Sequence, residues 1–197
     1  MTKRATTSKN QAERWFRNHA ENFLRRIGVR ECRQIVDIGC HKGRFTIAAA
    51  RIVGLCGAVY AIDKDKKVLA SMKTNIKKAK QQNITVIKAD LAKNTFTAIK
   101  QESIDLALLY DMLHRGYLPE RRERRNMLRH VFRIVKPGGI LSCFPTHLKK
   151  YGFTFKKLLA EITEAGITLQ EEVYPRLVHD EKLVRGRVFR FSKPLAR

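Results

Sequence analysis

The sequence predicts an α/β fold in which a doubly wound, mainly parallel sheet of about seven strands carries helices on both faces. Three observations favour this fold. Short apolar runs alternate with amphipathic segments, a pattern typical of strands connected through helices. Most of these runs are nearly continuous in apolar character, as parallel strands buried on both faces require. Four successive runs end in an aspartate, which predicts four carboxylates along one edge of the sheet.

The length of the chain indicates one domain. A chain of 197 residues is long enough for one sizeable core and short for two, and no linker or internal repeat marks a boundary. We therefore expect a single domain over 1–197. It comprises an N-terminal helix (8–28), a core carrying the ligand-binding edge (34–144), and a C-terminal helix with antiparallel edge strands (145–197).

Five amphipathic segments predict helices. In the first, the residues on one helical face are apolar and Gly28 supplies a stop; they are Ala12, Trp15, Phe16, Phe23, Leu24 and Ile27. The other helices are expected over 44–53, 64–82, 119–136 and 155–165. Gly54 is the expected cap of the second, and "PGG" breaks the fourth.

The apolar runs predict strands at 33–39, 57–63, 83–90, 104–111, 140–144, 167–173 and 187–191. About a dozen residues without a helical pattern separate the last two, so these should pair antiparallel at one edge.

The cysteines and the N-terminus indicate where the protein works. Cys32, Cys40, Cys56 and Cys143 occur singly and without the spacing of a zinc site, so we expect reduced, mostly buried thiols and no metal. The segment "MTKRATTSKN" is basic but lacks the apolar core of a secretory signal, and no apolar run approaches the length of a membrane span. We therefore expect a cytoplasmic protein.

The net charge is unusual. Lys and Arg number 41 against 18 Asp and Glu, a formal charge of +23, which attracts polyanions. The basic residues are spread over the chain, and the run 121–125 lies beside Glu120 and Glu123, so a solvated, partly paired helix face explains that run best. Arg185, Arg187 and Arg190 form a second candidate patch, in which charge is mixed with two core phenylalanines.

The four strand-end acids are Asp37, Asp63, Asp90 and Asp111. In a parallel sheet the ligand lies beyond the carboxyl ends of the strands, where a glycine-rich turn allows close backbone approach and an acid after the second strand can hold ribose hydroxyls. The loop "VDIGCHKGRFT" lacks the G-x-G-x-x-G spacing that receives a pyrophosphate. Asp90 could accept from an adenine amino group, so S-adenosylmethionine fits better than a dinucleotide.

Here the sequence resembles a known family. "VDIGCHKGRFT" is similar to the first motif of class I S-adenosylmethionine-dependent methyltransferases. "AID" resembles their ribose acid, "KAD" their adenine acid, and "IVKPGG" the signature before their fifth strand. Order and spacing agree over 34–144, and "LLYDMLH" with "LSCFPTH" most resembles small stand-alone members related to ubiquinone and menaquinone methyltransferases.

The resemblance implies a Rossmann-like fold, S-adenosylmethionine as cofactor and S-adenosylhomocysteine as product. Asp63 would bind the ribose, Asp90 with Leu91 the adenine, and Asp111 would lie where the methyl group meets its acceptor. The full cofactor-binding set implied is Asp37, Gly39, Cys40, His41, Gly43, Asp63, Lys64, Asp90, Leu91 and Asp111. His41 departs from the family, many of whose members have glycine there. Its side chain either crowds the cofactor carboxylate or, with Lys42, neutralises it.

Asp111 and His114 are the candidate catalytic residues. A sulfonium is an activated methyl donor, so positioning supplies much of the rate, and a base is needed only for a protonated acceptor. A histidine at the start of a loop more often caps or faces solvent, and His147 is a similar candidate. Tyr110 is expected to pack. The motif around Cys143 does not match cytosine carbon-5 methyltransferases, and "YDMLH" is not an Asp-Pro-Pro-Tyr loop.

Three hypotheses about the function follow. A small or lipid-like acceptor predicts that the N-terminal helix, with Trp15 and Phe16, closes over a partly apolar pocket. An RNA or other nucleic-acid acceptor predicts an open positive rim. The third hypothesis is a non-catalytic nucleic-acid-binding protein on a methyltransferase scaffold. The oligomeric state and the atom methylated stay open.

Overall fold

The computed structural model describes residues 3–93 and 97–195, and the side chains from residue 10 onward. Its helices are α1 (Lys3–Asn18), α2 (Ala20–Arg26), α3 (Arg44–Val53), α4 (Lys66–Lys78), α5 (Arg121–Ile134) and α6 (Phe155–Glu164), with a 3₁₀ turn, η1 (Lys149–Tyr151). The strands of the main sheet are β1 (Gln34–Ile38), β2 (Ala58–Asp63), β3 (Ile84–Lys88), β4 (Ile104–Tyr110), β5 (Val135–Phe144), β6 (Thr168–Val173) and β9 (Val188–Ser192). A separate hairpin contains β7 (Arg176–His179) and β8 (Lys182–Arg185).

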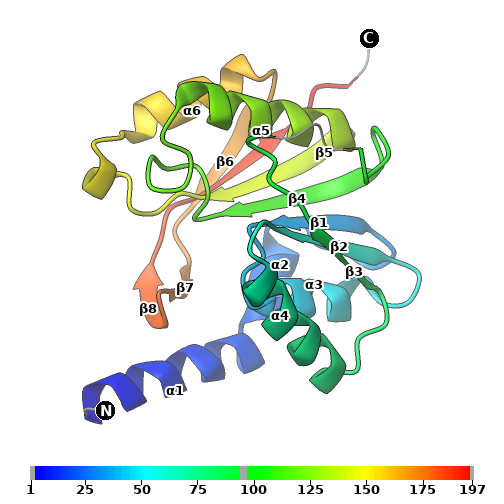
Figure 1. Ribbon diagram of the computed structural model, residues 1–197, viewed down its shortest axis with the longest axis vertical. Helices are drawn as coiled ribbons and strands as arrows, with labels where there is room; N and C mark the ends of the chain where they lie inside the picture. The colour runs from blue at the N-terminus through cyan, green and yellow to red at the C-terminus, as the bar shows by residue number, and fades with distance from the viewer. Residues whose placement is uncertain (1–2, 94–96, 196–197) are drawn as a thin grey trace.

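The main sheet has seven strands in the order β3-β2-β1-β4-β5-β9-β6 (Figure 1). The first five strands are parallel to their neighbours, whereas β9 runs antiparallel to both β5 and β6. Helices α5 and α6 cover one face, and α2, α3 and α4 cover the other. The predicted fold class is confirmed. Because the strand order reverses between β1 and β4, the ligand-binding position of such a sheet lies beyond these two strands.

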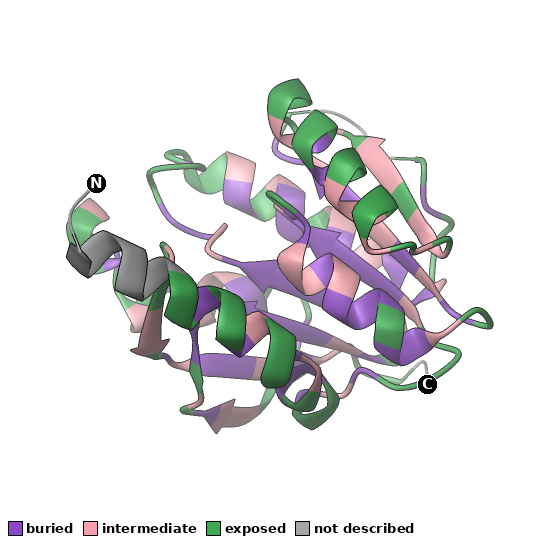
Figure 2. Ribbon diagram, turned by 90° about the horizontal axis from the view of Figure 1, so that it is seen from below, coloured by how far each residue is buried: buried purple, intermediate pink, exposed green. Residues whose placement is uncertain are grey.

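The strands read as continuous apolar runs because both of their faces are covered. In β1, Ile35 packs toward α2 and α3, whereas Val36 and Ile38 pack toward α5 and α6, and all three are at most 1% exposed. In Figure 2 the central strands of the sheet are mostly buried, whereas the helices that flank them carry exposed residues. Successive side chains of a strand therefore stabilise two separate apolar layers.

Three details of the fold were predicted wrongly. The N-terminal segment 8–28 is not one helix, because His19 separates α1 from α2. Strand β5 begins at Val135 instead of residue 140, since Val135 pairs with Ile104 before an irregularity in the register. The hairpin β7–β8 was not predicted, because its two short strands lie within one gap between longer apolar runs. No helix within the described ranges is long and apolar enough to cross a bilayer.

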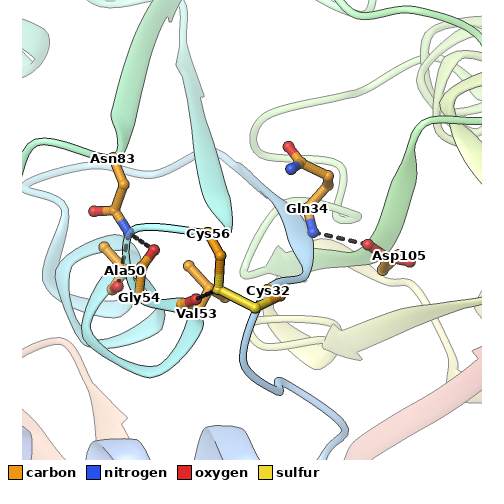
Figure 3. Close-up of a disulfide and its surroundings, with 8 residues drawn as sticks. All are labelled: Cys32, Gln34, Ala50, Val53, Gly54, Cys56, Asn83 and Asp105. Carbon is orange, nitrogen blue, oxygen red and sulfur yellow. Dashed lines mark hydrogen bonds between the residues drawn. A yellow bond between two sulfur atoms is a disulfide. The ribbon is translucent and has the colours of Figure 1, made fainter.

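A disulfide corrects the expectation that all four cysteines are reduced. Cys32 and Cys56 are bonded, whereas Cys40 and Cys143 are free and buried (Figure 3). Cys32 precedes β1 and Cys56 precedes β2, so the parallel pairing of these strands brings together residues that are 24 apart in sequence. Asn83 stabilises the same corner by donating from its amide to the carbonyls of Ala50 and Gly54. A spacing of 24 residues carries no recognisable signal in the sequence.

Candidate active site

A cavity of about 610 Å³ lies at the carboxyl ends of the parallel strands. Asp90 lines it after β3, Asp63 at the end of β2, Gly39 after β1 and Asp111 after β4. Because the strands lie in the order β3-β2-β1-β4, these four residues follow one another along the rim in the same order. The wall continues past Asp111 to His179 of the β7–β8 hairpin. One continuous cavity thus extends from the two acids after β2 and β3 to a histidine that is distant in the sequence.

Left-handed backbone conformations shape the loop after β1. Gly39 has φ +77°, and a Cβ at this position would lie 2.2 Å from Met112 Sδ. His41 has φ +48°, a region that glycine adopts without steric cost. The glycine common in the family at this position therefore has a conformational reason. In this chain His41 adopts the same conformation with its side chain exposed.

Backbone amides hold the carboxylate of Asp63 in place. The backbone N–H of His41 donates to Oδ2 over 3.1 Å, and that of Asp65 donates to Oδ1 over 3.0 Å. Each carboxylate oxygen has further acceptor capacity. Asp63 can therefore receive hydroxyl donors from the cavity without moving.

Asp90 is held in a similar way at the next strand end. The backbone N–H of Ala92 donates to Asp90 Oδ1 over 3.1 Å, and Leu91 between them is buried and lines the cavity. A carboxylate beside an apolar wall suits an aromatic ring that carries an amino group. This arrangement fits the predicted adenine site.

Asp37 and Cys40 lie at the inner side of the loop. Asp37 is 4% exposed and accepts from the hydroxyl of Thr46 in α3. Burial raises the pKa of Asp37 to about 6; the bond from Thr46 opposes this shift and the nearby charge of Asp63 adds to it. The thiol of Cys40 lies 3.4 Å from Met72 Sδ, and burial raises its pKa. Asp37, near the end of β1, therefore connects the strand that leads into the loop to α3. Cys40, within the loop, packs against α4.

At the other end of the cavity, His114 lies behind Asp111. The backbone N–H of Gly116 donates to His114 Nδ1 over 3.0 Å, so a neutral ring carries its proton on Nε2. That nitrogen lies 3.4 Å from Asp111 Oδ1. The ring is 3% exposed and stacks on Tyr151, with the ring centroids 5.0 Å apart. His114 therefore lies where it can orient Asp111, and it is not among the residues that line the cavity.

Two further histidines, from distant segments, lie beside Asp111. His147 follows β5, and His179 ends β7 at the hairpin turn. Their Nε2 atoms are 3.0 Å apart, and each ring has a nitrogen 3.9 Å from Asp111 Oδ2. His147 was a candidate base in the sequence analysis, whereas His179 was not. Two apolar pairs, Leu177–Val178 and Leu183–Val184, flank the two-residue turn at Asp180 and Glu181, a hairpin signal that could have located it.

An aromatic cluster covers the cavity from the side of α1. Phe16, Phe45, Tyr110 and Phe144 all line it, and Phe45 makes edge contacts with both Phe16 and Tyr110. The hydroxyl of Tyr110 lies 3.0 Å from that of Ser142, so this ring packs, as expected. Phe16 was expected here under the apolar-acceptor hypothesis, whereas Phe45, Tyr110 and Phe144 were not among the predicted site residues.

Two contacts tie the β7–β8 hairpin to the elements around it. Trp15 of α1 is buried and donates from Nε1 to the carbonyl of Arg176 over 3.0 Å. Arg44 of α3 forms an ion pair of 2.7 Å with Glu181. In Figure 1, α1 and the hairpin lie on the same side of the molecule, below α5 and α6. The hairpin and α1 together close that side of the cavity.

The cavity is acidic although the protein is strongly basic. Its described wall contains three basic residues, Lys42, Arg44 and Lys64, against a larger set of acids: Asp37, Asp63, Asp65, Asp90, Asp111, Asp180 and Glu181. This excess of carboxylates favours a cationic ligand and disfavours a phosphodiester backbone. The overall charge of +23 therefore does not describe the site.

The candidate basic patches contain several intramolecular ion pairs. Arg124, expected on a solvated helix face, is instead 2% exposed and forms a bidentate pair with Glu161 at 2.7 and 2.9 Å. Near the C-terminus, Arg187 pairs with Glu172, and Arg190 pairs with Glu171. Arg185 ends β8 whereas Arg190 lies within β9, so the second candidate patch is not one face of one strand. These pairs leave less positive charge available for a polyanion.

The structure brings most of the predicted cofactor residues to one cavity. Those that line it are Asp37, Gly39, Cys40, His41, Asp63, Lys64, Asp90, Leu91 and Asp111. Gly43 lies beside Met72 as the N-cap of α3, with φ +77°, so it shapes the loop from behind. The individual roles of these residues stay predictions.

Comparison with known proteins agrees with this architecture. A family model described as a methyltransferase domain matches residues 35–139. A solved S-adenosylmethionine-dependent methyltransferase from Aquifex aeolicus superposes with a TM-score of 0.75 and 17% identity, covering 96% of this chain and 98% of that one.

Two demethylmenaquinone methyltransferases are similar in sequence. The protein from Geobacillus sp. (strain WCH70) is 28% identical over 134 residues, which cover 66% of this chain and 54% of that protein. The protein from Geobacillus stearothermophilus is 27% identical over 174 residues, covering 79% of this chain and 70% of its own length. The match thus spans about half of the first relative. Since the family model covers more than half of the chain, the chain belongs to the class I S-adenosylmethionine-dependent methyltransferases.

Proposed function

We propose that this protein transfers the methyl group of S-adenosylmethionine to a small, flat and largely apolar acceptor that carries a hydroxyl group. The observation that carries the proposal is a single cavity with two chemically different ends. Acids held by backbone amides line the end at β2 and β3, and an aromatic cluster with Asp111 lines the other.

The cavity fits the cofactor of the family. A volume of about 610 Å³ lies within the range of small-molecule sites. Asp63 offers acceptor oxygens for two ribose hydroxyls, and Asp90 with Leu91 offers an acceptor and an apolar wall for adenine. The surplus of carboxylates stabilises a positively charged sulfonium. His41 does not prevent this fit, because its side chain is exposed and its backbone N–H orients Asp63.

The aromatic end of the cavity supports an apolar acceptor. Phe16, Phe45 and Phe144 can contact both faces and the edge of a planar ring. Two sequence relatives are named as demethylmenaquinone methyltransferases, and a quinone in its reduced form is a planar ring with hydroxyl groups. We therefore place this chain's acceptor in the class of hydroxylated aromatic or quinol-like compounds.

The reaction needs little beyond positioning and one proton acceptor. As the acceptor attacks, its new bond to the methyl carbon forms while the S–CH₃ bond breaks, and the electron pair stays on sulfur as a neutral thioether. The acceptor hydroxyl releases its proton to solvent at or before this step, and where a ring carbon takes the methyl group, that carbon then loses its hydrogen as a proton and the hydroxyl is restored. Asp111 lies between the cavity and the histidines, where it can orient that hydroxyl.

Transfer of labelled methyl from S-adenosylmethionine to reduced naphthoquinones without a ring methyl, and to total RNA, tests the proposal. We expect quinol methylation, and Phe16→Ala should raise the KM for the quinol about tenfold by removing apolar contact while the affinity for S-adenosylhomocysteine stays unchanged. Phe155→Ala is the matched control, since that ring packs on Phe189 and Arg187 away from the cavity. If RNA is methylated and the quinols are not, the acceptor is a nucleic acid and this acceptor class is wrong.

A further inference from the structure

Four side chains that could bind a metal ion converge beside the acceptor end of the cavity. Asp111 follows β4, His147 follows β5, and His179 and Asp180 lie at the turn of the β7–β8 hairpin. Ligand atoms of Asp111, His147 and His179 all lie within 4.8 Å of one another. Asp180 Oδ2 lies 3.4 Å from the Nε2 of each histidine. With the 3.0 Å between the two nitrogens, these three atoms form a nearly regular triangle.

The dimensions of this triangle match a metal coordination sphere. Donor atoms about 2.0 to 2.1 Å from a tetrahedral zinc ion lie roughly 3.4 Å from one another. Edges of 3.0, 3.4 and 3.4 Å are close to that value. Asp111 Oδ2, 3.9 Å from His147 Nε2, lies on the cavity side, where it can complete a four-ligand set.

If both histidines are neutral, the cluster has too few N–H donors for its acceptor atoms. Each neutral imidazole carries one proton. If one Nε2–H donates to the other Nε2, neither ring has an Nε2 proton left for Asp180, although its carboxylate faces both nitrogens. Lone pairs that converge without a proton repel one another, and a cation among them removes the repulsion.

A separate observation comes from the buried side of Asp111. Asp111 Oδ1 and His114 Nε2 are buried, 3.4 Å apart, and make no hydrogen bond to another group in the described chain. Metal-binding carboxylates are usually oriented by an outer hydrogen-bond donor. His114, 3% exposed and fixed by Gly116 and Tyr151, is placed to be that donor once Asp111 is drawn into a fixed position.

The backbone supports the same interpretation. Asp111, His147 and Asp180 have φ of +56°, +55° and +48°, which L-residues rarely adopt. Such conformations cluster at ligand sites because a bound ligand can offset their cost. The positive φ of Asp180 is explained by the two-residue hairpin turn in which it lies, so this argument rests on Asp111 and His147.

We propose that His147, His179, Asp111 and Asp180 bind one divalent transition-metal ion of the zinc type. Two imidazoles with two carboxylates suit such ions better than Mg²⁺ or Ca²⁺, which prefer oxygen ligands alone. The role of the ion rests on the proposed function: the acceptor oxygen adds as a fifth ligand, the ion lowers the pKa of that hydroxyl, and this favours release of its proton to solvent before methyl transfer. The cavity end at β2 and β3 takes no part in this site.

The test uses the full chain without an affinity tag, stripped with chelator and titrated with Zn²⁺ by calorimetry. We expect one ion per chain. The double variant His147→Gln and His179→Gln should weaken binding at least a hundredfold, by analogy with the loss of inner ligands. Co²⁺ should give the visible absorption of a tetrahedral N/O site without a thiolate band, which excludes Cys40 and Cys143 as ligands.

Two controls separate this proposal from the previous one. His19→Ala, at the exposed break between α1 and α2, should leave Zn²⁺ affinity unchanged. S-adenosylhomocysteine should bind the metal-free double variant as tightly as the wild type. Absence of stoichiometric Zn²⁺ binding to folded protein, or equal binding by the double variant, overturns the metal site. If the wild type binds Zn²⁺ but does not bind S-adenosylhomocysteine, the proposed function is overturned and the metal site is retained.

Discussion

The two ends of the cavity differ in how their acids are held. At the end formed by β2 and β3, Asp63 accepts from the backbone amides of Asp65 and of His41 in the neighbouring loop after β1, and Asp90 accepts from that of Ala92. At the other end, Asp111 Oδ1 and His114 Nε2 make no hydrogen bond within the described residues. The first end is therefore preorganised by the chain, whereas the second has polar groups that a ligand could satisfy.

The origin of these groups explains the contrast. The loop after β1 and the acids after β2 and β3 come from consecutive strands that pair directly. The acceptor end combines the loop after β4, the segment after β5 and the β7–β8 hairpin, up to 70 residues further along the chain. Local backbone geometry builds the first end, and long-range packing builds the second.

The largest expected effect comes from Arg124, which anchors the loop of the acceptor end. Its guanidinium pairs with Glu161 and also donates to the carbonyls of Leu118 and Pro119. Arg124→Met should lower the free energy of unfolding by about 3 to 5 kcal/mol, because Glu161 loses its close partner and is left with Arg121 at 4.0 Å, and two carbonyls lose their donor. Denaturant titration measures this, with Arg122→Met on the exposed face as control. Equal stability of the two variants would contradict long-range packing as the source of the acceptor end.

The Cys32–Cys56 bond should have the next largest effect, at the amino ends of β1 and β2, on the opposite edge of the sheet from the cavity. The paired change Cys32→Ser and Cys56→Ser should lower the free energy of unfolding by about 3 kcal/mol, since the bond closes a 24-residue separation. A reductant should reproduce this loss in the wild type and leave the paired variant unaffected. A reductant-insensitive melting temperature in the wild type would show that the bond does not stabilise this edge of the sheet.

Asp37 makes the stability of the cofactor end depend on pH. Its pKa rises from 3.8 to about 6 on folding, so its contribution is fully present below pH 4 and is lost as the pH rises through 6. Asp37→Asn, which mimics the protonated form, should be more stable than the wild type by roughly 2 to 3 kcal/mol at pH 7.5. At pH 4 the difference should vanish. Chemical unfolding at both values measures this, and a constant difference between them would refute the raised pKa.

The smallest effect concerns His41. His41→Gly relieves a left-handed conformation and should raise the free energy of unfolding by at most about 1 kcal/mol. Because the backbone N–H that reaches Asp63 is retained, affinity for S-adenosylhomocysteine should change less than about threefold. A larger loss of affinity would mean that the imidazole itself contacts the cofactor.

The two ends also differed in how well the sequence predicted them. Asp63 and Asp90 end apolar runs, so strand periodicity alone placed them at one rim, and the structure brings both to the cavity. The hairpin signal around His179 was missed, and of the aromatic cluster only Phe16 was expected near the pocket, because the proximity of the others depends on how α1 and the hairpin pack. The disulfide escaped prediction for the same reason. The family resemblance, the sheet and the antiparallel β9 are confirmed.

Binding of S-adenosylhomocysteine to the wild type and to Asp63→Ala, measured by calorimetry, tests the central claim most directly. We expect one site per chain in the wild type and at least a thirtyfold weaker affinity in the variant, because two hydrogen bonds to a charged acceptor are lost. Glu31→Ala is the control: this carboxylate is exposed and does not line the cavity, so the variant should bind normally. Equal affinity of Asp63→Ala and the wild type, or no binding to the folded wild type, would contradict the assignment of this cavity to the cofactor.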